Sequence, residues 1–318
     1  MLKIVYMGTP DFAVGPLEAI FNAGHEIAAV VTAPDKPAGR GRKLTSSEVK
    51  KFAAAHDLPL LQPVNLKDSA FLNIIKEINP DLIVVIAFRM LPEAVWRIPS
   101  KGTINLHASL LPQYRGAAPI NWALINGETQ TGLTTFFINE TIDTGDIIMQ
   151  EAVEISENDN FGTLHDRLKE MGKSIILKTL DTVESGTAKA IAQNNIQKDS
   201  KPAPKLNKEN TRIDWHQATK DIFNKIRGLS PFPGAWTMLM SENGTEQLLK
   251  ISDAGPGMTE TSSQSPGTII SDGKTYIHVV CGQGMLQVNK LQLSGRSMMT
   301  TAEFLRGYAG LLNGAILK

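Results

Sequence analysis

Short apolar runs alternate with amphipathic segments through the first third of the chain. Residues 2–7 and 26–32 are apolar runs rich in β-branched residues, which predicts two strands. Residues 12–23 carry apolar side chains at helical spacing, which predicts a helix between them. Residues 81–87 form an apolar run without alternation, as in a central parallel strand covered on both faces. The pattern therefore predicts an α/β fold with a mostly parallel sheet and right-handed crossovers.

The pattern changes after residue 130. Residues 131–138 and 146–155 are rich in strand-forming residues and are joined by a glycine-containing turn. Residues 160–184 then predict one long amphipathic helix. We expect the first domain, a scaffold of the kind that binds nucleotides or cofactors, to close after this helix, and we place it at residues 1–189.

A polar stretch separates this half from the rest of the chain. Residues 190–206 lack hydrophobic periodicity and contain two prolines and several lysines, which predicts an interdomain linker. After one more helical pattern, residues 207–318 show short strand candidates separated by glycine, proline, serine and asparagine. Short strands with regular turns predict a small C-terminal β-barrel domain.

Composition narrows the class of protein. The chain has 318 residues, more than one hydrophobic core usually serves, so two domains are expected. The 32 Lys and Arg residues equal the 32 Asp and Glu residues in number, so any surface for an acidic partner must be local. The single cysteine, Cys281, excludes an internal disulfide, and no cluster of Cys and His has metal-ligand spacing. Because a signal-peptide layout and a membrane-length apolar run are both missing, we expect a cytoplasmic protein.

The first predicted strand is followed by Gly8-Thr9-Pro10. Dinucleotide-binding folds carry the fingerprint G-x-G-x-x-G at this place, and the sequence lacks it. We interpret the segment as a tight turn, and a nicotinamide-dependent oxidoreductase is disfavoured.

Asn105 and His107 lie in a strand-like stretch, where their spacing of two places both side chains on one face. A carboxamide and an imidazole that converge on one atom suit a carbonyl whose oxygen becomes negative, because both donate hydrogen bonds. An isolated pair of this kind is more often structural than catalytic. The proline- and glycine-punctuated loop over residues 109–119 favours the functional interpretation, since α/β sheets bind ligands beyond the carboxyl ends of their strands.

Asp143 belongs to the sequence Asp-Thr-Gly-Asp between two β-rich runs. Taken by itself, this spacing is typical of a β-turn. The alternative is that Asp143 reaches His107, fixes its tautomer and stabilises its cation, as orienting carboxylates do at other histidine sites. Sequence alone leaves both interpretations open.

A basic, glycine-broken loop spans residues 35–44. Charge runs of this kind are usually solvated surface. Glycines give the loop freedom to order on binding, and its closely spaced cations suit phosphate groups, so contact with nucleic acid or phosphate is equally well supported.

With these motifs in place, the chain resembles the methionyl-tRNA formyltransferases, a branch of the folate-dependent formyltransferases, almost from end to end. The Asn-x-His pair, Ser-Leu-Leu-Pro and Asp-Thr-Gly are motifs that the resemblance shares with all folate-dependent formyltransferases. The segment Gly8 to Phe12, the basic loop and the C-terminal half, including Arg212-Ile213-Asp214-Trp215, narrow the resemblance to the branch that acts on tRNA.

The resemblance implies a Rossmann-like formyltransferase domain followed by a C-terminal barrel similar to an oligonucleotide-binding fold. It implies 10-formyltetrahydrofolate as formyl donor, methionyl initiator tRNA as acceptor, a monomer and no metal. The implied catalytic residues are Asn105, His107 and Asp143. The implied folate-binding residues are Ser109, Leu110, Leu111 and Pro112, with a cis peptide before the proline. The implied tRNA-binding residues are Lys36, Arg40, Arg42, Lys43 and Lys205.

One segment departs from the family pattern. Most members have Tyr-Gly where this chain has Phe88-Arg89, in a segment that wraps the pterin through backbone groups. An arginine disfavours the positive φ that glycine permits, so folate geometry is expected to differ there, as variation within the family.

Several rival functions follow from the same residues. Formyl-folate enzymes that act on glycinamide ribonucleotide, on an amino sugar nucleotide or on water share the motifs, but the ribonucleotide enzymes usually lack a C-terminal half. A nucleic-acid-binding module on an inactive scaffold is disfavoured because Asn105, His107 and Asp143 are all present.

Overall fold

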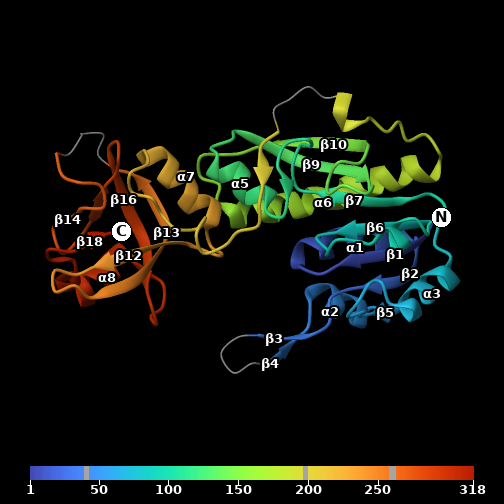
Figure 1. Cartoon of the computed structure of the whole chain (residues 1–318), viewed down its shortest axis with the longest axis horizontal. Coiled ribbons are helices and arrows are strands. Elements are labelled where there is room, and N and C mark those ends of the chain that lie inside the picture. The colour runs from blue at the N-terminus through green and yellow to red at the C-terminus, as the bar shows by residue number, and fades with distance from the viewer. Residues whose placement is uncertain (39–42, 196–199, 258–262) are drawn as a thin grey trace. The chain divides into compact units, whose positions relative to one another are not determined.

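The structure, a computed structural model, describes residues 1–38, 43–195, 200–257 and 263–318 (Figure 1). These residues pack into two compact units. The first comprises residues 1–119, 131–154 and 165–203, and the second comprises residues 120–130, 155–164 and 204–318. Each unit is therefore built from segments that are not consecutive in the sequence.

A seven-stranded sheet forms the first unit. Its strands are β1 (Lys3–Gly8), β2 (Glu26–Val31), β5 (Leu60–Leu61), β6 (Leu82–Ile86), β7 (Thr103–His107), β9 (Gln130–Phe137) and β10 (Ile147–Glu154). Their order is β10-β9-β7-β6-β1-β2-β5. Parallel pairing joins β5 to β2, β2 to β1, β1 to β6 and β6 to β7. The pair β7–β9 is antiparallel. The mostly parallel sheet confirms the predicted fold class, and the fully buried β6 is the central strand expected at residues 81–87.

Helices cover both faces of this sheet (Figure 1). The helical segments of this unit are η1 (Asp11–Ala13), α1 (Val14–Asn22), α2 (Glu48–Ala55), α3 (Ser69–Ile78), α4 (Glu93–Trp96) and most of α6 (Phe161–Glu184). On one face, α3 buries Phe71 and Ile75 in a cluster that includes Val85 of β6. On the other face α6 comes close to the sheet because Gly172 has no side chain, and a Cβ there would lie 3.3 Å from Leu106.

Two short strand pairs and a 3-10 turn complete the first unit. β3 (Lys36–Ala38) pairs with β4 (Lys43–Thr45), and β8 (Arg115–Gly116) pairs in parallel with β11 (Pro202–Ala203). The turn η2 spans Gln193–Asn195. Both β11 and η2 come from the polar stretch after α6, so this stretch returns to the first unit and makes backbone hydrogen bonds with it.

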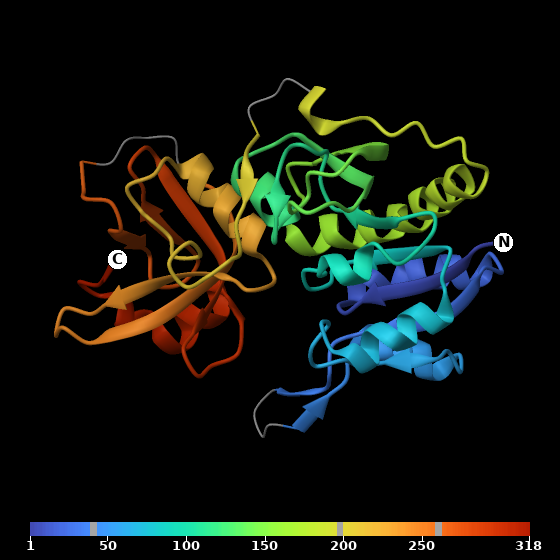
Figure 2. The same cartoon turned by 45° about the vertical axis from the view of Figure 1, so that its right-hand side comes forward.

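The second unit is an antiparallel barrel. Its strands are β12 (Ala235–Met240), β13 (Glu246–Pro256), β14 (Ile269–Ser271), β15 (Ile277–Val280), β16 (Met285–Leu293), β17 (Met299–Thr300) and β18 (Ile316–Leu317). The order is β14-β15-β16-β13-β12-β18, and a bridge between Thr268 and Ile316 brings the two ends of the sheet together. Figure 2 shows these strands, coloured orange to red, curving around a common core. The nearly closed barrel confirms the predicted second domain type.

The helical segments of the second unit are α5 (Pro119–Ile125), α7 (Thr219–Leu229), α8 (Thr301–Tyr308) and η3 (Ala309–Leu312). The barrel core contains Trp215, Ile226 of α7, Leu286 and Phe304 of α8. Only the α7 pattern, at residues 217–227, is anticipated in the sequence. The start of α8 is not anticipated, although its capping box, Thr300 and Glu303, stands in the sequence as a signal. The Thr300 hydroxyl accepts a hydrogen bond from the Glu303 N–H at 3.3 Å, and the Thr300 N–H donates to the Glu303 carboxylate at 2.8 Å.

The cap gives a testable stability prediction. We expect Thr300→Ala to lower the free energy of unfolding by about 1 kcal/mol, because it removes the hydroxyl acceptor of the cap. Hydrogen bonds from the Thr300 N–H and hydroxyl lower the pKa of Glu303. Their contribution is complete above the ordinary glutamate pKa and is lost as pH falls through the lower folded value, so the deficit should shrink in acid. Denaturant titrations at several pH values, with Thr300→Ser as control, measure it. An equal deficit at every pH contradicts the role of the carboxylate.

Candidate active site

The loops at one edge of the parallel sheet provide the setting of the site. β1, β6 and β7 are neighbours and run parallel, so the segments that follow them leave from the same edge. Ligands of open α/β sheets bind beyond the carboxyl ends of the strands. Residues 87–92 follow β6 and residues 108–118 follow β7 at this edge.

Asn105 and His107 lie at the carboxyl end of β7 and alternate with Leu106, so they share one face. Asn105 is paired across the sheet with Val85, which packs in the α3 cluster, and the two polar side chains therefore point to that face. The half-buried Asn105 carboxamide makes no hydrogen bond with any part of the chain that the structure describes. Its donor is free for a ligand.

His107 is buried, held by a hydrogen bond at one ring nitrogen, and faces a carboxylate at the other. The side chain is 8% exposed, and Nε2 lies 2.8 Å from the Tyr114 carbonyl oxygen. A carbonyl only accepts, so Nε2 carries a proton. Nδ1 lies 3.8 Å from Asp143 Oδ2, which is longer than a hydrogen bond. Nδ1 therefore faces the carboxylate without a direct hydrogen bond to it.

A backbone N–H group holds the carboxylate of Asp143. It lies between β9 and β10 with φ of 55°, a left-handed conformation that aspartate tolerates better than most residues. Its Oδ2 accepts a hydrogen bond from the Gly116 N–H at 2.9 Å. Gly116 has φ of 125°, and a Cβ there would lie 2.4 Å from the Ala203 carbonyl oxygen. Only glycine can therefore present this N–H to the carboxylate while β8 pairs with β11.

The Tyr114 carbonyl that binds His107 is itself supported. The Tyr114 N–H donates to the Lys201 carbonyl oxygen at 2.7 Å, just before β8 and β11 pair. The imidazole and the carboxylate are thus both anchored on residues 114–116, and residues 201–203 brace that segment.

Residues 109–112 form a buried segment beside the histidine. The Thr134 hydroxyl donates to the Ser109 carbonyl at 2.6 Å and accepts from the Leu111 N–H at 3.1 Å. Gln150 donates to the Leu111 carbonyl at 2.8 Å. The Leu111–Pro112 peptide is cis, as the sequence resemblance predicts. These bonds give the segment a fixed shape against β9.

The predicted basic residues that the structure describes come from both units. Lys36 is exposed on β3, and Lys43 lies on the paired strand β4. Arg40 and Arg42 lie outside the described residues. Lys205 is exposed in the second unit.

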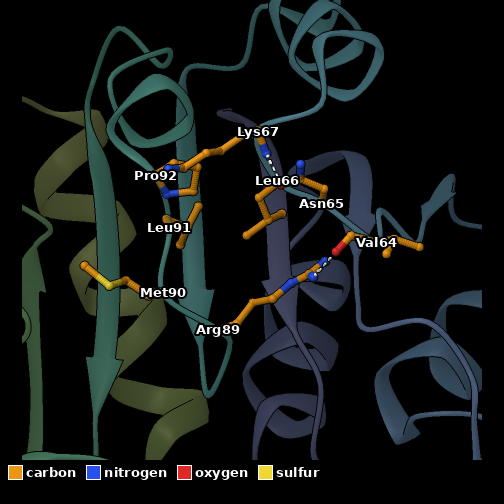
Figure 3. Close-up of a pocket in the computed structure, with 8 residues that line it drawn as sticks. All are labelled: Val64, Asn65, Leu66, Lys67, Arg89, Met90, Leu91 and Pro92. Atoms are coloured by element: carbon orange, nitrogen blue, oxygen red, sulfur yellow. Dashed lines mark hydrogen bonds between the residues drawn. The ribbon is translucent and has the colours of Figure 1, made fainter.

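Arg89 shapes the pocket at the same edge. Its guanidinium donates to the Val64 carbonyl at 2.8 Å and to the Pro63 carbonyl, and burial lowers its pKa. Figure 3 shows the side chain crossing toward Val64. The cavity has a volume of about 440 Å³ and is lined by Val64, Asn65, Leu66, Lys67, Arg89, Met90, Leu91 and Pro92. Arg89 has no positive φ, in agreement with the replacement of glycine by arginine, and the positive φ of this segment is at Ala87, at 47°, directly after β6.

Sequence reasoning missed the residues that support the site. Thr134 and Gln150 hold the 109–112 segment, and the buried Gln193 contacts the loop of Asp143. For Thr134 the available signal is its position in an apolar strand, which predicts a buried side chain. Gln193 stands in a polar stretch without periodicity, and nothing in the sequence marks it.

Two family matches cover most of the chain. Residues 2–180 match the family described as Formyl transferase, and residues 205–309 match Formyl transferase, C-terminal domain. The chain belongs to the formyltransferase family. It is 48% identical over 309 residues, 96% of this chain and 95% of the relative, to the methionyl-tRNA formyltransferase of Bacteroides fragilis. It is 49% identical over 306 residues, 96% of each chain, to the methionyl-tRNA formyltransferase of Flavobacterium johnsoniae.

Solved structures share the fold. HypX from Aquifex aeolicus in complex with tetrahydrofolic acid has a TM-score of 0.64 at 18% identity, covering 98% of this chain and 48% of that chain. This chain thus spans about half the length of HypX. The sugar 3N-formyltransferase WlaRD has a TM-score of 0.64 at 19% identity, covering 93% of this chain and 99% of that chain.

The residues that the structure describes are those of the ranges 1–38, 43–195, 200–257 and 263–318. They contain no group of three or more His, Cys, Asp or Glu side chains arranged to hold a metal ion. None of their helices has both the length and the apolar character needed to cross a membrane.

The Thr134 network gives a prediction with a matched control. We expect Thr134→Val to leave the Ser109 carbonyl and the Leu111 N–H without a protein partner and to lower the free energy of unfolding by about 1–3 kcal/mol. Thr135 is also buried in β9, but its hydroxyl pairs with Thr179 of α6 at 2.8 Å. Hydrogen exchange at the Leu111 amide should accelerate in Thr134→Val and not in Thr135→Val. Equal exchange in both variants would refute the assigned support.

Proposed function

We propose that this protein transfers the formyl group of 10-formyltetrahydrofolate to the amino group of methionyl initiator tRNA, producing N-formylmethionyl-tRNA for translation initiation. Full-length similarity to two proteins named methionyl-tRNA formyltransferase supports the acceptor. The complex of HypX with tetrahydrofolic acid supports a folate donor. The single observation that carries the chemistry is that Asn105, with a free carboxamide, shares a face of β7 with His107, whose Nδ1 lies 3.8 Å from Asp143.

The proposed reaction uses these three residues directly. The neutral methionyl amine attacks the formyl carbon, and the formyl oxygen becomes negative between the Asn105 amide and the Nδ1–H of protonated His107. Asp143 stabilises the imidazolium. It also takes the proton that the amine loses and returns it, directly or through water, to the folate nitrogen as the C–N bond to the formyl group breaks. The Tyr114 carbonyl keeps the other ring nitrogen protonated and fixes the ring.

In this proposal the folate is held by Ser109, Leu110, Leu111 and Pro112. The fixed backbone of this segment suits contact with a flat ring system, because its shape does not have to form on binding. Residues 1–189 are then the catalytic domain, and residues 190–206 link it to a tRNA-binding barrel at residues 207–318.

The tRNA would be bound by phosphate contacts from Lys36, Arg40, Arg42, Lys43 and Lys205. Near Lys205, the exposed Lys208 and Arg212 lie 5.5 Å and 5.4 Å from the centre of the Trp236 ring. Their cations and the indole add to the basic surface of the barrel, which suits a polyanion.

The finer assignments of location and assembly belong to the same proposal. We place the protein in the cytoplasm, where initiator tRNA is charged, and we expect it to act as a monomer. The buried free thiol of Cys281 is compatible with a reducing compartment.

The support for the rival acceptors is weaker. WlaRD, a sugar formyltransferase, is 19% identical, whereas the named tRNA enzymes are 48–49% identical across both units. The match of residues 205–309 to a formyltransferase C-terminal domain favours an acceptor large enough to need that domain.

A formyl-transfer assay tests the acceptor and the site together. Radiolabelled formyl is offered from 10-formyltetrahydrofolate to charged initiator tRNA, charged elongator methionyl-tRNA and small amines. We expect selective labelling of initiator tRNA, and a loss of about 10²- to 10³-fold in kcat for His107→Ala and for Asn105→Ala. His56→Ala, at an exposed histidine after α2, is the control. Labelling of a small amine alone, or release of formate without transfer, would reject the tRNA assignment.

Salt dependence tests the proposed phosphate contacts. We expect the KM for tRNA to rise steeply with salt, since each neutralised phosphate releases counterions. Lys36→Ala and Lys205→Ala should each reduce the slope of log KM against log salt by about one. Lys76→Ala, at an exposed lysine of α3, should leave the slope unchanged. A flat salt response of the parent protein would count against tRNA binding by these residues.

A further inference from the structure

Gln193 is a buried polar residue in a stretch that is otherwise exposed. Its side chain is 3% exposed, whereas the neighbouring Ile191 and Asn194 are exposed. Its amide nitrogen donates to the Asp143 carbonyl at 3.0 Å and to the Gly145 carbonyl at 2.8 Å. Its Oε1 accepts from Arg115 Nε at 3.1 Å and from Nη2 at 2.6 Å. Both donors and both lone pairs of the carboxamide are therefore used within the protein.

These four bonds join the two segments whose separation defines the acid–base pair. Arg115 precedes Gly116, whose N–H holds the Asp143 carboxylate, and the Gln193 amide holds the backbone of Asp143 and Gly145. A change in the spacing of these segments would change the 3.8 Å distance from Asp143 Oδ2 to His107 Nδ1.

The loop of Asp143 needs such support. Asp143 is in the left-handed region, and a Cβ at Gly145 would lie 1.6 Å from the Phe137 carbonyl oxygen, so the loop is tightly folded. A residue in a sparsely populated conformation persists only where its surroundings hold it. Gln193 binds the carbonyls at Asp143 and two residues later, which fixes the backbone on which the carboxylate is carried.

We infer that Gln193 is a positioning residue for the formyl-transfer reaction: through the backbone of residues 143–145 and the side chain of Arg115, it sets the carboxylate of Asp143 against His107. It touches neither substrate nor reacting atoms. The inference rests on the proposed function, because it acts through Asp143 and His107. It also gives the start of the stretch at residues 190–206 a role in chemistry, beyond connecting two domains.

The test compares Gln193→Met, which keeps the length of the side chain and removes its hydrogen bonds, with Asn194→Ala at the exposed neighbour. We expect Gln193→Met to lower kcat by about 10- to 100-fold, because misplacement by about 1 Å is enough for such losses. The KM values for tRNA and folate should change less than about twofold. Asn194→Ala should match the parent in kcat and in both KM values.

A double-mutant cycle with Asp143→Ala shows whether Gln193 works through the carboxylate. The double variant should be no slower than Asp143→Ala alone, because Gln193 acts only by positioning the carboxylate that Asp143→Ala removes. Additive losses would overturn the inference. Arg115→Met removes the donors to the Gln193 oxygen and should lower kcat in the same direction. It keeps the inference testable if Gln193→Met fails to fold, which a thermal melt reports.

The outcomes separate the two levels of proposal. If His107→Ala and Asp143→Ala retain the parent kcat, the proposed site fails whatever Gln193 does. If those variants lose activity while Gln193→Met keeps the parent kcat, the role of Gln193 is rejected and the proposed function stands.

Discussion

The hydrogen bond from the Gly116 N–H to the Asp143 carboxylate is the interaction on which the rest of the site depends. A carboxylate that is mostly removed from water needs a partner, and a charge-assisted bond to a backbone N–H supplies one without adding a second charge. The backbone donor leaves the negative charge of Asp143 directed at His107. A lysine or arginine in its place would neutralise that charge and end its influence on the imidazole.

This choice of donor constrains distant parts of the chain. Gly116 can approach Asp143 only where a Cβ is absent, because the Ala203 carbonyl occupies that space. Lys201, just before the strand that contains Ala203, accepts the hydrogen bond from the N–H of Tyr114, whose carbonyl binds His107. Residues some 90 positions after the histidine therefore decide its orientation. The site lies at the edge of the sheet, and residues 201–203 fix the segment that orients its side chains.

The agreement between pattern and structure depends on how strongly each element is packed. The apolar run at residues 81–87 becomes the buried strand Leu82–Ile86, and the amphipathic pattern at 160–184 becomes the helix Phe161–Glu184. β12 is not anticipated, although its buried positions alternate along the strand. The polar stretch after α6 predicts a linker by the same logic, yet buried polar contacts hold Gln193 against the first unit, and hydropathy does not detect such contacts.

By itself the sequence determined the α/β class with a following barrel, the placement of Asn105 and His107 on one face, and the motifs that resemble a formyltransferase. These follow from the period of hydrophobic positions and from local residue types, which are properties of each segment of the sequence. Only the tertiary structure decided that Asp143 faces His107 and is not merely a turn residue, that the left-handed backbone falls at Ala87 and not at Arg89, and that Gln193 belongs to the site. Each of these depends on contacts between residues far apart in sequence. Such contacts are set by packing and do not appear in the periodicity of hydrophobic residues.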